Sequence, residues 1–101
     1  MMRVHVYATL RRIVGDGRVE LPAAPNDTVG AVLGRLLDAY PALRPLILDE
    51  AGELLPYVNV FLNGRMVEFL DGLDTAVQDE DELDVFPPIA GGGRRPVLLR
   101  P

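Results

Sequence analysis

Three consecutive glycines near the end of the chain, Gly91, Gly92 and Gly93, are the residues whose type and spacing most clearly suggest chemistry. They follow the rigid stretch Phe86-Pro87-Pro88 after only two further residues. Because glycine has no Cβ, such a run costs the most entropy to order and adds no side chain to a core. A glycine run is useful where a binding site requires the backbone itself to approach a partner closely. The run is therefore either a reactive tail or a loose end.

The other residue types that usually carry chemistry are scarce. The sequence has no cysteine, which excludes disulfides, thiolate catalysis and thiolate metal sites. His5 is the only histidine, and a lone strand histidine without a partner is expected to be structural. The acidic run from Asp79 to Asp84 lacks the spacing and glycine of a calcium loop, so we expect a solvated turn. No metal and no bound cofactor are predicted.

Composition and charge limit the class of protein. With 101 residues, 49% of them hydrophobic, the chain fits one domain around one core. The formal charge of −5 disfavours nucleic acid as a partner and favours a basic protein. No signal peptide and no membrane-length apolar run are visible, so a cytoplasmic location away from membranes is expected. All ten basic residues are arginines, and the sequence has no lysine.

Hydrophobic periodicity predicts the elements that must hold the tail. Alternation from Val4 to Thr9 predicts a first strand, which returns through an Asp16-Gly17 hairpin turn into a strand over 18–21. Asp27 or Thr28 can cap a helix whose core-facing side comprises Val29, Val32, Leu33, Leu36, Leu37 and Tyr40.

The second half of the sequence has the pattern of another hairpin and a last strand. Val58, Val60 and Leu62 share a strand face, and Asn63-Gly64 is a strong hairpin signal. The last strand covers 83–87, and alternation predicts that Phe61 and Phe86 point away from Val60 and Val85. The order of these elements along the chain, a hairpin, a helix, a second hairpin and a last strand, predicts an α+β fold with one main helix packed on one face of the sheet. First and last strands side by side in the middle would let the C-terminal tail leave from the core.

With this pattern of elements, the chain resembles the MoaD and ThiS group, the ubiquitin-like β-grasp sulfur carriers. The stretch from Val85 through Phe86, Pro87, Pro88, Ile89 and Ala90 to Gly91-Gly92 is similar to the ending of molybdopterin synthase small subunits. The stretch from Phe69 to Thr75 resembles the carrier of cysteine biosynthesis. The resemblance spans about residues 3–92 and implies a mixed sheet of four to five strands with a flexible diglycine tail.

The resemblance also implies an activity. An E1-like enzyme uses ATP to adenylate the terminal carboxylate of the diglycine, and a sulfur donor then converts the acyl-adenylate to a thiocarboxylate. Gly92 would carry the reactive carboxylate with Gly91 beside it, while Phe86, Pro87, Pro88, Ile89 and Ala90 would contact partners. The chain is then a protein substrate and carrier rather than an enzyme, although it could form the sulfur-donating subunit of a synthase. The sulfur-accepting partner would then be the large subunit of a molybdopterin synthase or a cysteine synthase.

Two positions depart from the family pattern. Glu80 replaces the glycine that many relatives have in the last acidic turn, so this turn must accept a side chain. Nine residues, 93–101, follow Gly92, and the diglycine then has no free carboxylate. We expect a JAMM-type metalloprotease to cut after Gly92, although Gly93 is an alternative cut point. Loss of Arg94, Arg95 and Arg100 would change the formal charge from −5 to −8.

The expected organisation is a β-grasp domain over 1–88, a reactive tail over 89–93 and a removable extension over 94–101. Two other functions stay open. One is a ubiquitin-like modifier conjugated through Gly92, which without lysine could not form lysine-linked chains. The other is a β-grasp interaction module without C-terminal chemistry. The sequence does not choose among molybdopterin precursor, activated serine, tRNA and thiazole as the sulfur acceptor.

Overall fold

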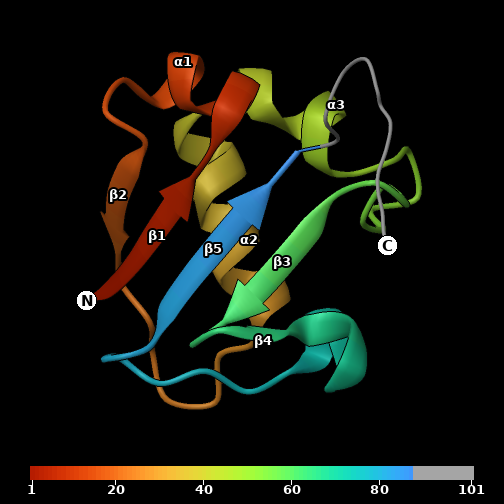
Figure 1. Cartoon of the computed structure of the whole chain (residues 1–101). Coiled ribbons are helices and arrows are strands. Elements are labelled where there is room, and N and C mark those ends of the chain that lie inside the picture. The colour runs from red at the N-terminus through yellow and green to blue at the C-terminus, as the bar shows by residue number, and fades with distance from the viewer. Residues whose placement is uncertain (88–101) are drawn as a thin grey trace.

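The computed structural model describes residues 1–87, which form one sheet with a helix across one of its faces (Figure 1). The strand order is β2-β1-β5-β3-β4. The strands are β1 (Met2–Val6), β2 (Arg18–Leu21), β3 (Asn59–Leu62), β4 (Arg65–Met66) and β5 (Glu82–Phe86).

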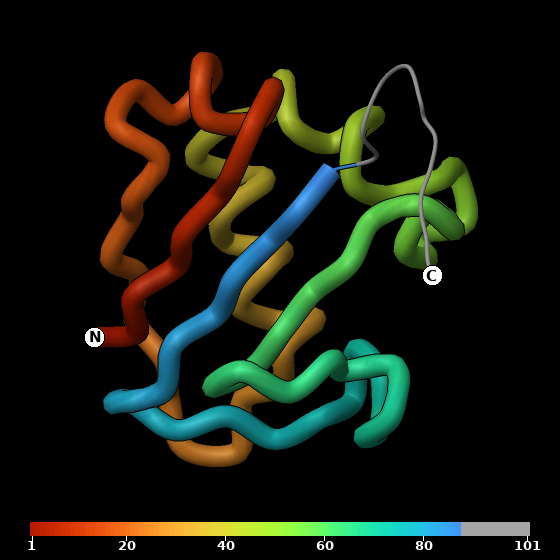
Figure 2. Tube along the Cα trace, in the orientation of Figure 1, coloured from red at the N-terminus to blue at the C-terminus, as the bar shows by residue number. Residues whose placement is uncertain are grey.

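The last strand lies in the middle of the sheet. Figure 2 shows β5 running between β1 and β3. It pairs in parallel with β1, where Val4 is opposite Leu83, and antiparallel with β3, where Val60 is opposite Val85. The two outer pairs are antiparallel. The sheet is therefore mixed, and the first and last strands lie side by side in it.

The main helix, α2 (Val29–Ala39), packs on the sheet as its periodicity predicts. Thr28 is the N-cap, because its Oγ1 accepts a hydrogen bond of 3.2 Å from the Ala31 N–H. Burial of each large apolar side chain contributes about 1.5–3 kcal/mol, which makes this face the main source of the helix's stability. Its fully buried side chains are Val29, Val32, Leu33, Leu36 and Leu37.

Short helical pieces close the ends of the core. Their buried residues include Leu10, Leu43 and Ile47, each with no exposed surface. No helix within residues 1–87 is long and apolar enough to cross a membrane. The pieces are the α-helical turns α1 (Arg11–Val14) and α3 (Arg44–Ile47) and the 3₁₀ turns η1 (Ala8–Leu10), η2 (Pro41–Leu43), η3 (Val67–Phe69) and η4 (Gly72–Asp74).

The first hairpin differs from its prediction. The strand ends at Val6, and the chain reaches β2 through η1 and α1 rather than through a tight turn. Ala8 has a φ of +55°, which takes the backbone out of the extended region. Burial of Leu10 then favours the longer path, because its side chain would otherwise remain in water.

The second hairpin has the predicted turn. Asn63 and Gly64 have φ values of +52° and +85°, as a two-residue turn of this type requires at both central positions. The strands that it joins are in register at Leu62 and Arg65.

Candidate functional site

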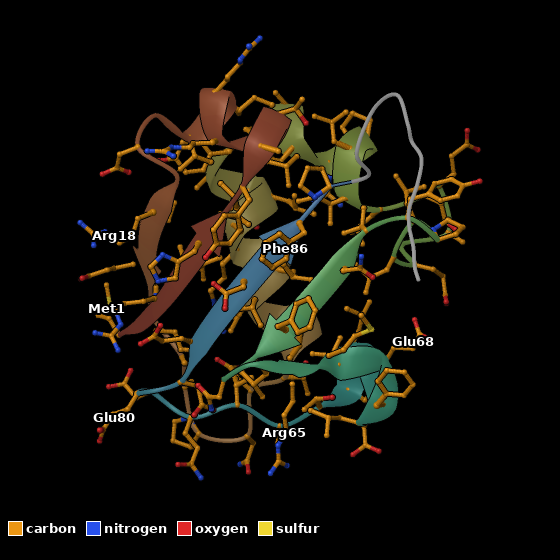
Figure 3. All side chains as sticks on the ribbon, in the orientation of Figure 1. Met1, Arg18, Arg65, Glu68, Glu80 and Phe86 are labelled. Atoms are coloured by element: carbon orange, nitrogen blue, oxygen red, sulfur yellow. The ribbon has the colours of Figure 1, made fainter. Side chains whose placement is uncertain are left out.

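The face of the sheet opposite α2 is not covered by any helix of residues 1–87, and Phe86 lies on it (Figure 3). Side chains alternate along each strand, so the residues between the buried ones point to this face. Val60 and Val85 are buried under α2, whereas Phe61 and Phe86 are half-buried on the other face. The predicted orientation of the two phenylalanines is confirmed.

Three rings meet on this face and form what we call the aromatic cluster: Tyr7, Phe61 and Phe86. The ring of Phe61 stands edge-on to that of Phe86, with centroids 5.5 Å apart and an interplanar angle of 88°. Tyr7 covers part of Phe86 from the other side. Both arrangements are favourable for aromatic pairs. The cluster is a partly apolar surface at the point where β5 ends.

Tyr7 is held in the cluster by a polar contact. Its hydroxyl donates a hydrogen bond of 2.8 Å to Oδ1 of Asp84. The pKa of the Tyr7 hydroxyl is raised. The hydrogen bond to Asp84 is the largest cause, and burial and the charges of Asp84 and Glu82 are smaller ones. Tyr7 is not among the site residues predicted from the sequence. The signal that could have found it is its spacing, since Tyr7 is two residues beyond His5 and therefore continues the same face of β1.

Charged side chains lie on the same face, nearer the start of the two central strands than the aromatic cluster. Arg3 forms an ion pair with Glu82, and His5 Nε2 lies 3.7 Å from Oε1 of the same carboxylate. These pairs are exposed, so each contributes little to stability. In the part of the chain that the structure describes, no group of three or more His, Cys, Asp or Glu side chains could hold a metal ion.

The acidic turn before β5 has a structural role. Oδ2 of Asp81 accepts the Gln78 N–H at 2.7 Å, and Oδ1 accepts the side-chain amide of Asn63 at 2.9 Å. Both carboxylate oxygens are therefore used to fix the turn. Glu80 does not have a positive φ here, so the turn accepts its side chain without strain.

Of the predicted site residues, the structure describes two. Phe86 is the last residue of β5, and Pro87 follows it as a buried residue. Proline has no N–H and cannot extend the ladder, so the pairing of the central strand stops there. Pro87 thus directly follows the central strand and the Phe86 of the aromatic cluster. Pro88, Ile89, Ala90, Gly91 and Gly92 lie outside the described residues.

Comparison with known proteins gives two kinds of relative. The chain is 41% identical over 91 residues to small archaeal modifier protein 3 of Haloferax volcanii, covering 90% of this chain and 98% of that protein. It is 36% identical over 72 residues to the sulfur carrier protein CysO of Mycobacterium tuberculosis, covering 69% and 77%. Both relatives are named for carrying or attaching a group rather than for catalysis.

The fold agrees with that of a solved structure of another small archaeal modifier protein. The crystal structure of SAMP1 from Haloferax volcanii superposes with a TM-score of 0.81 at 34% identity, covering 90% of this chain and 98% of that one. The predicted ubiquitin-like β-grasp fold is confirmed by this match, and the sheet has five strands. The sequence profile of the ThiS family matches residues 4–92, a range that includes the diglycine. The chain therefore belongs to the ThiS family of MoaD/ThiS-type, ubiquitin-like sulfur carriers and small modifiers.

Proposed function

We propose that this chain carries sulfur as a thiocarboxylate on Gly92. In the proposed reaction, a carboxylate oxygen of Gly92 attacks the α-phosphate of ATP on an E1-like enzyme and pyrophosphate leaves. Sulfide then attacks the acyl carbon and displaces AMP, which leaves the thiocarboxylate. The chain itself binds no cofactor in this scheme, because ATP is bound by the activating partner.

The observation that carries this proposal is the position of Phe86. It ends the central strand, it packs in the aromatic cluster, and it is six residues before Gly92 in the sequence. Six extended residues span at most about 20 Å. A partner that docks on the aromatic cluster could therefore receive Gly92 in an active site up to that distance away. The contact residues in this proposal are Phe86, Pro87, Pro88, Ile89 and Ala90.

The proposed organisation follows from the same reaction. Residues 1–88 are the β-grasp domain, 89–93 the reactive tail, and 94–101 an extension that must be removed to free the carboxylate of Gly92. A JAMM-type metalloprotease is the proposed processing enzyme. The sulfur-accepting partner is a molybdopterin synthase large subunit or a cysteine synthase, and the CysO relative favours the second.

A second candidate function is supported by the archaeal relative, which is named a modifier protein. In that case Gly92 would form an isopeptide bond with lysines of target proteins. The same adenylate serves both reactions, and they differ only in whether sulfur or a lysine amine displaces AMP. Because the chain has no lysine, only single attachments to targets are expected.

The intact mass of the protein isolated from its own cells tests the proposal. A species that ends at Gly92, with a fraction in which sulfur replaces one carboxyl oxygen, is the expected result. Fragment spectra of lysine residues joined to Gly92 in other proteins would support the modifier function instead. A protein that always ends at Pro101, without either form, would overturn both and leave an interaction module.

In vitro, three chains provide a matched test of the tail: the full chain, the chain ending at Gly92, and that shorter chain with Gly92→Ala. With the cognate activating enzyme, only the chain ending at Gly92 should support rapid exchange of pyrophosphate into ATP. The added Cβ should slow adenylation because the active site of the activating enzyme is expected to require bare backbone at this position. Equal exchange by all three chains would contradict the assignment of Gly92.

A further inference from the structure

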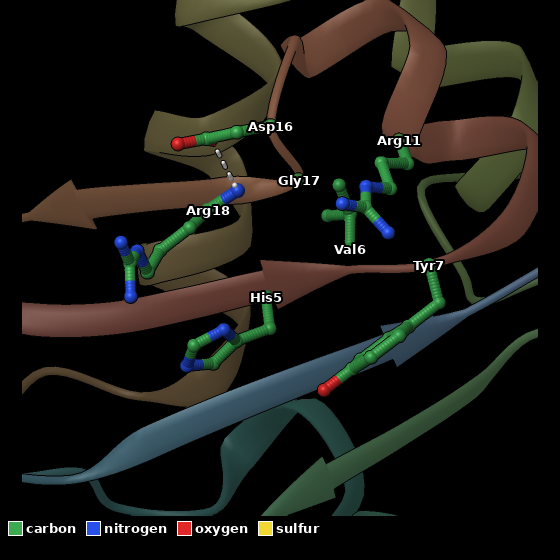
Figure 4. A pocket seen from close by; sticks show the side chains of 7 residues that line it. All are labelled: His5, Val6, Tyr7, Arg11, Asp16, Gly17 and Arg18. Carbon is green, nitrogen blue, oxygen red and sulfur yellow. Dashed lines mark hydrogen bonds between the residues drawn. The ribbon is translucent and has the colours of Figure 1, made fainter.

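A hollow of about 360 Å³ lies where β1, α1 and β2 meet, and Figure 4 shows the side chains around it. Arg11 reaches over it from α1, Arg18 borders it from β2, and His5 and Tyr7 border it from β1 and its end. The backbone at Gly17 completes the wall. Neither the sulfur chemistry nor the aromatic cluster requires the two arginines.

The two arginines are not neutralised by neighbours. Within residues 1–87, Arg3, Arg35 and Arg44 form ion pairs, whereas neither Arg11 nor Arg18 has a carboxylate within 4.0 Å. Two positive charges thus border one hollow in a chain whose formal charge is −5.

Asp16 is the acidic residue of the wall, and it has another function. Its Oδ1 accepts the backbone N–H of Arg18 at 3.0 Å, which fixes the turn into β2. Figure 4 shows its carboxylate turned away from Arg11. Asp16 is thus the one acidic residue that lines the hollow. The nearest other carboxylates, Asp84 and Glu82, lie beyond Tyr7 and His5, where Asp84 accepts the Tyr7 hydroxyl and Glu82 lies 3.7 Å from His5 Nε2.

The arrangement of Arg11 depends on Gly17. A Cβ at residue 17 would lie 2.9 Å from Cγ of Arg11 and 2.9 Å from the carbonyl oxygen of Val6. The arginine stem therefore lies against bare backbone, which limits its freedom while the guanidinium stays at the hollow. Gly17 is itself fixed, because its carbonyl oxygen accepts the Val6 N–H at 2.8 Å.

Arg18 is fixed by the sheet. It is paired with His5 in the register of β1 and β2, so its backbone cannot shift relative to the strand that forms the floor. One face of the Tyr7 ring is stacked on Phe86, which leaves the edge and the other face to border the hollow. The hollow thus combines two cations with an aromatic wall.

We propose that this hollow binds a doubly charged oxyanion, namely inorganic phosphate or the phosphate of a phosphomonoester. Guanidinium groups bind such oxygens through paired N–H donors, and two of them match the charge of the dianion. The aromatic wall would contact the organic part of a monoester. A carboxylate has half that charge and should bind more weakly.

The test is a titration of the full ¹⁵N-labelled chain with sodium phosphate at pH 7.5, with sodium chloride adjusted to hold ionic strength constant. We expect saturable shifts confined to the amides around the hollow and to the Nε–H groups of Arg11 and Arg18. Arg11→Gln and Arg18→Gln should each weaken binding about tenfold, as loss of one charge-assisted hydrogen-bonding group predicts.

Arg65→Gln is the matched control. Arg65 lies in β4, at the opposite edge of the sheet from β2, and has no carboxylate within 4.0 Å among the described residues (Figure 3). This variant should bind phosphate as the native chain does. Arg11→Lys and Arg18→Lys keep the charge and should bind with intermediate strength, and their spectra show whether any loss comes from misfolding.

Parallel titrations define the ligand class. Phosphoserine binding more tightly than phosphate would identify the monoester as the preferred source, and equal binding would identify phosphate itself. Acetate binding as tightly as phosphate would overturn the assignment of a dianion. Shifts that stay linear in phosphate, or that are the same in the Arg11, Arg18 and Arg65 variants, would overturn the site. None of these outcomes depends on the chemistry of Gly92.

Discussion

The ring of Tyr7 lies parallel to the ring of Phe86, with centroids 4.3 Å apart and an interplanar angle of 5°. The two residues are 79 positions apart in the sequence, and they bring the end of β1 against the last residue of the central strand. The end of the central strand is thereby packed against the N-terminal part of the chain. If a partner contacts Phe86, as we propose, it should therefore contact Tyr7 as well.

Replacement of Phe86 should impair adenylation more than folding. In Phe86→Asp the apolar centre of the cluster is lost and the new carboxylate lies in the strand of Asp84. If the cluster is a docking surface, loss of a central aromatic contact of about 2 kcal/mol should lower kcat/KM for pyrophosphate exchange about 30-fold. The assay uses the chain ending at Gly92 and its activating enzyme.

Phe69→Asp is the control for that experiment, because Phe69 is 79% exposed and belongs to η3, outside the aromatic cluster. It should leave exchange unchanged. Circular dichroism should show native helix and strand content in both variants. Equal turnover of the Phe86 and Phe69 variants would reject the cluster as the docking surface.

The hydroxyl of Tyr7 should make stability depend on alkaline pH. Folding raises its pKa above the ordinary 10.0, mainly through the hydrogen bond to Asp84, so the protonated form is favoured in the native state. The stabilisation is complete below pH 10.0 and is lost as the pH rises through the raised pKa. Tyr7→Phe, which lacks the hydroxyl, should not show this loss.

At pH 7 Tyr7→Phe should lower the free energy of unfolding by about 0.5–1 kcal/mol, the size of one partly exposed hydrogen bond. Urea denaturation of both proteins at several pH values measures the difference. It should shrink above pH 10.0. A difference that stayed constant through that range would show that folding does not raise the pKa of the Tyr7 hydroxyl.

Asp27 should control stability in acid. Its Oδ2 accepts hydrogen bonds from Arg35 at 2.7 Å and from the Ala24 N–H at 2.6 Å, and these, with the Arg35 bond the larger cause, lower the pKa of the carboxyl below the ordinary 3.8. The stabilisation is present above pH 3.8 and is lost as the pH falls through the lowered pKa. Asp27→Asn should therefore lower the Tm at pH 7 and have little effect in strong acid.

The control is Asp38→Asn. Asp38 is paired with Arg44 at 3.7 Å, and its side chain is 81% exposed, so this substitution should leave the Tm unchanged at every pH. Differential scanning calorimetry from pH 2 to pH 7 measures all three proteins. If Asp27→Asn lowered the Tm equally across that range, the effect would be one of packing rather than of charge.

Gly17 and Gly15 provide a matched pair for the wall of the hollow. Both have positive φ, +83° and +97°, but a Cβ would meet close neighbours only at Gly17. Gly15→Ala should cost about 1 kcal/mol of backbone strain. Gly17→Ala should cost about 1–2 kcal/mol more, because the Arg11 stem and the Val6 carbonyl must move. Urea denaturation gives both values, and equal costs would mean that Arg11 yields freely.

The sequence predicted those parts of the fold that depend on local pattern. The α2 helix, its Thr28 cap and the Asn63-Gly64 turn each follow from periodicity or from residues that prefer one backbone geometry. Alternation also placed Phe61 and Phe86 on one face, since the side-chain period of a strand is fixed.

Features that depend on distant contacts were not predictable in the same way. The path from Tyr7 to Gly17 looked like strand and tight turn, yet burial of Leu10 and the positive φ of Ala8 give helical turns instead. Those turns place Arg11 opposite Arg18 and Tyr7 on Phe86. No local pattern specifies either of these two contacts. Each joins elements whose distance from one another is determined by the pairing of the whole sheet.

The central place of β5 also has a consequence for timing. Its pairing joins Glu82 to Arg3, and the ribosome adds β5 after the other four strands. Until then β1 and β3 have no strand between them, and the sheet cannot close. A chain interrupted before Phe86 therefore lacks both the middle of its sheet and the centre of its aromatic cluster. Completion of the sheet is thus a late event of synthesis, since fewer than twenty of the 101 residues remain to be added once Phe86 is in the chain.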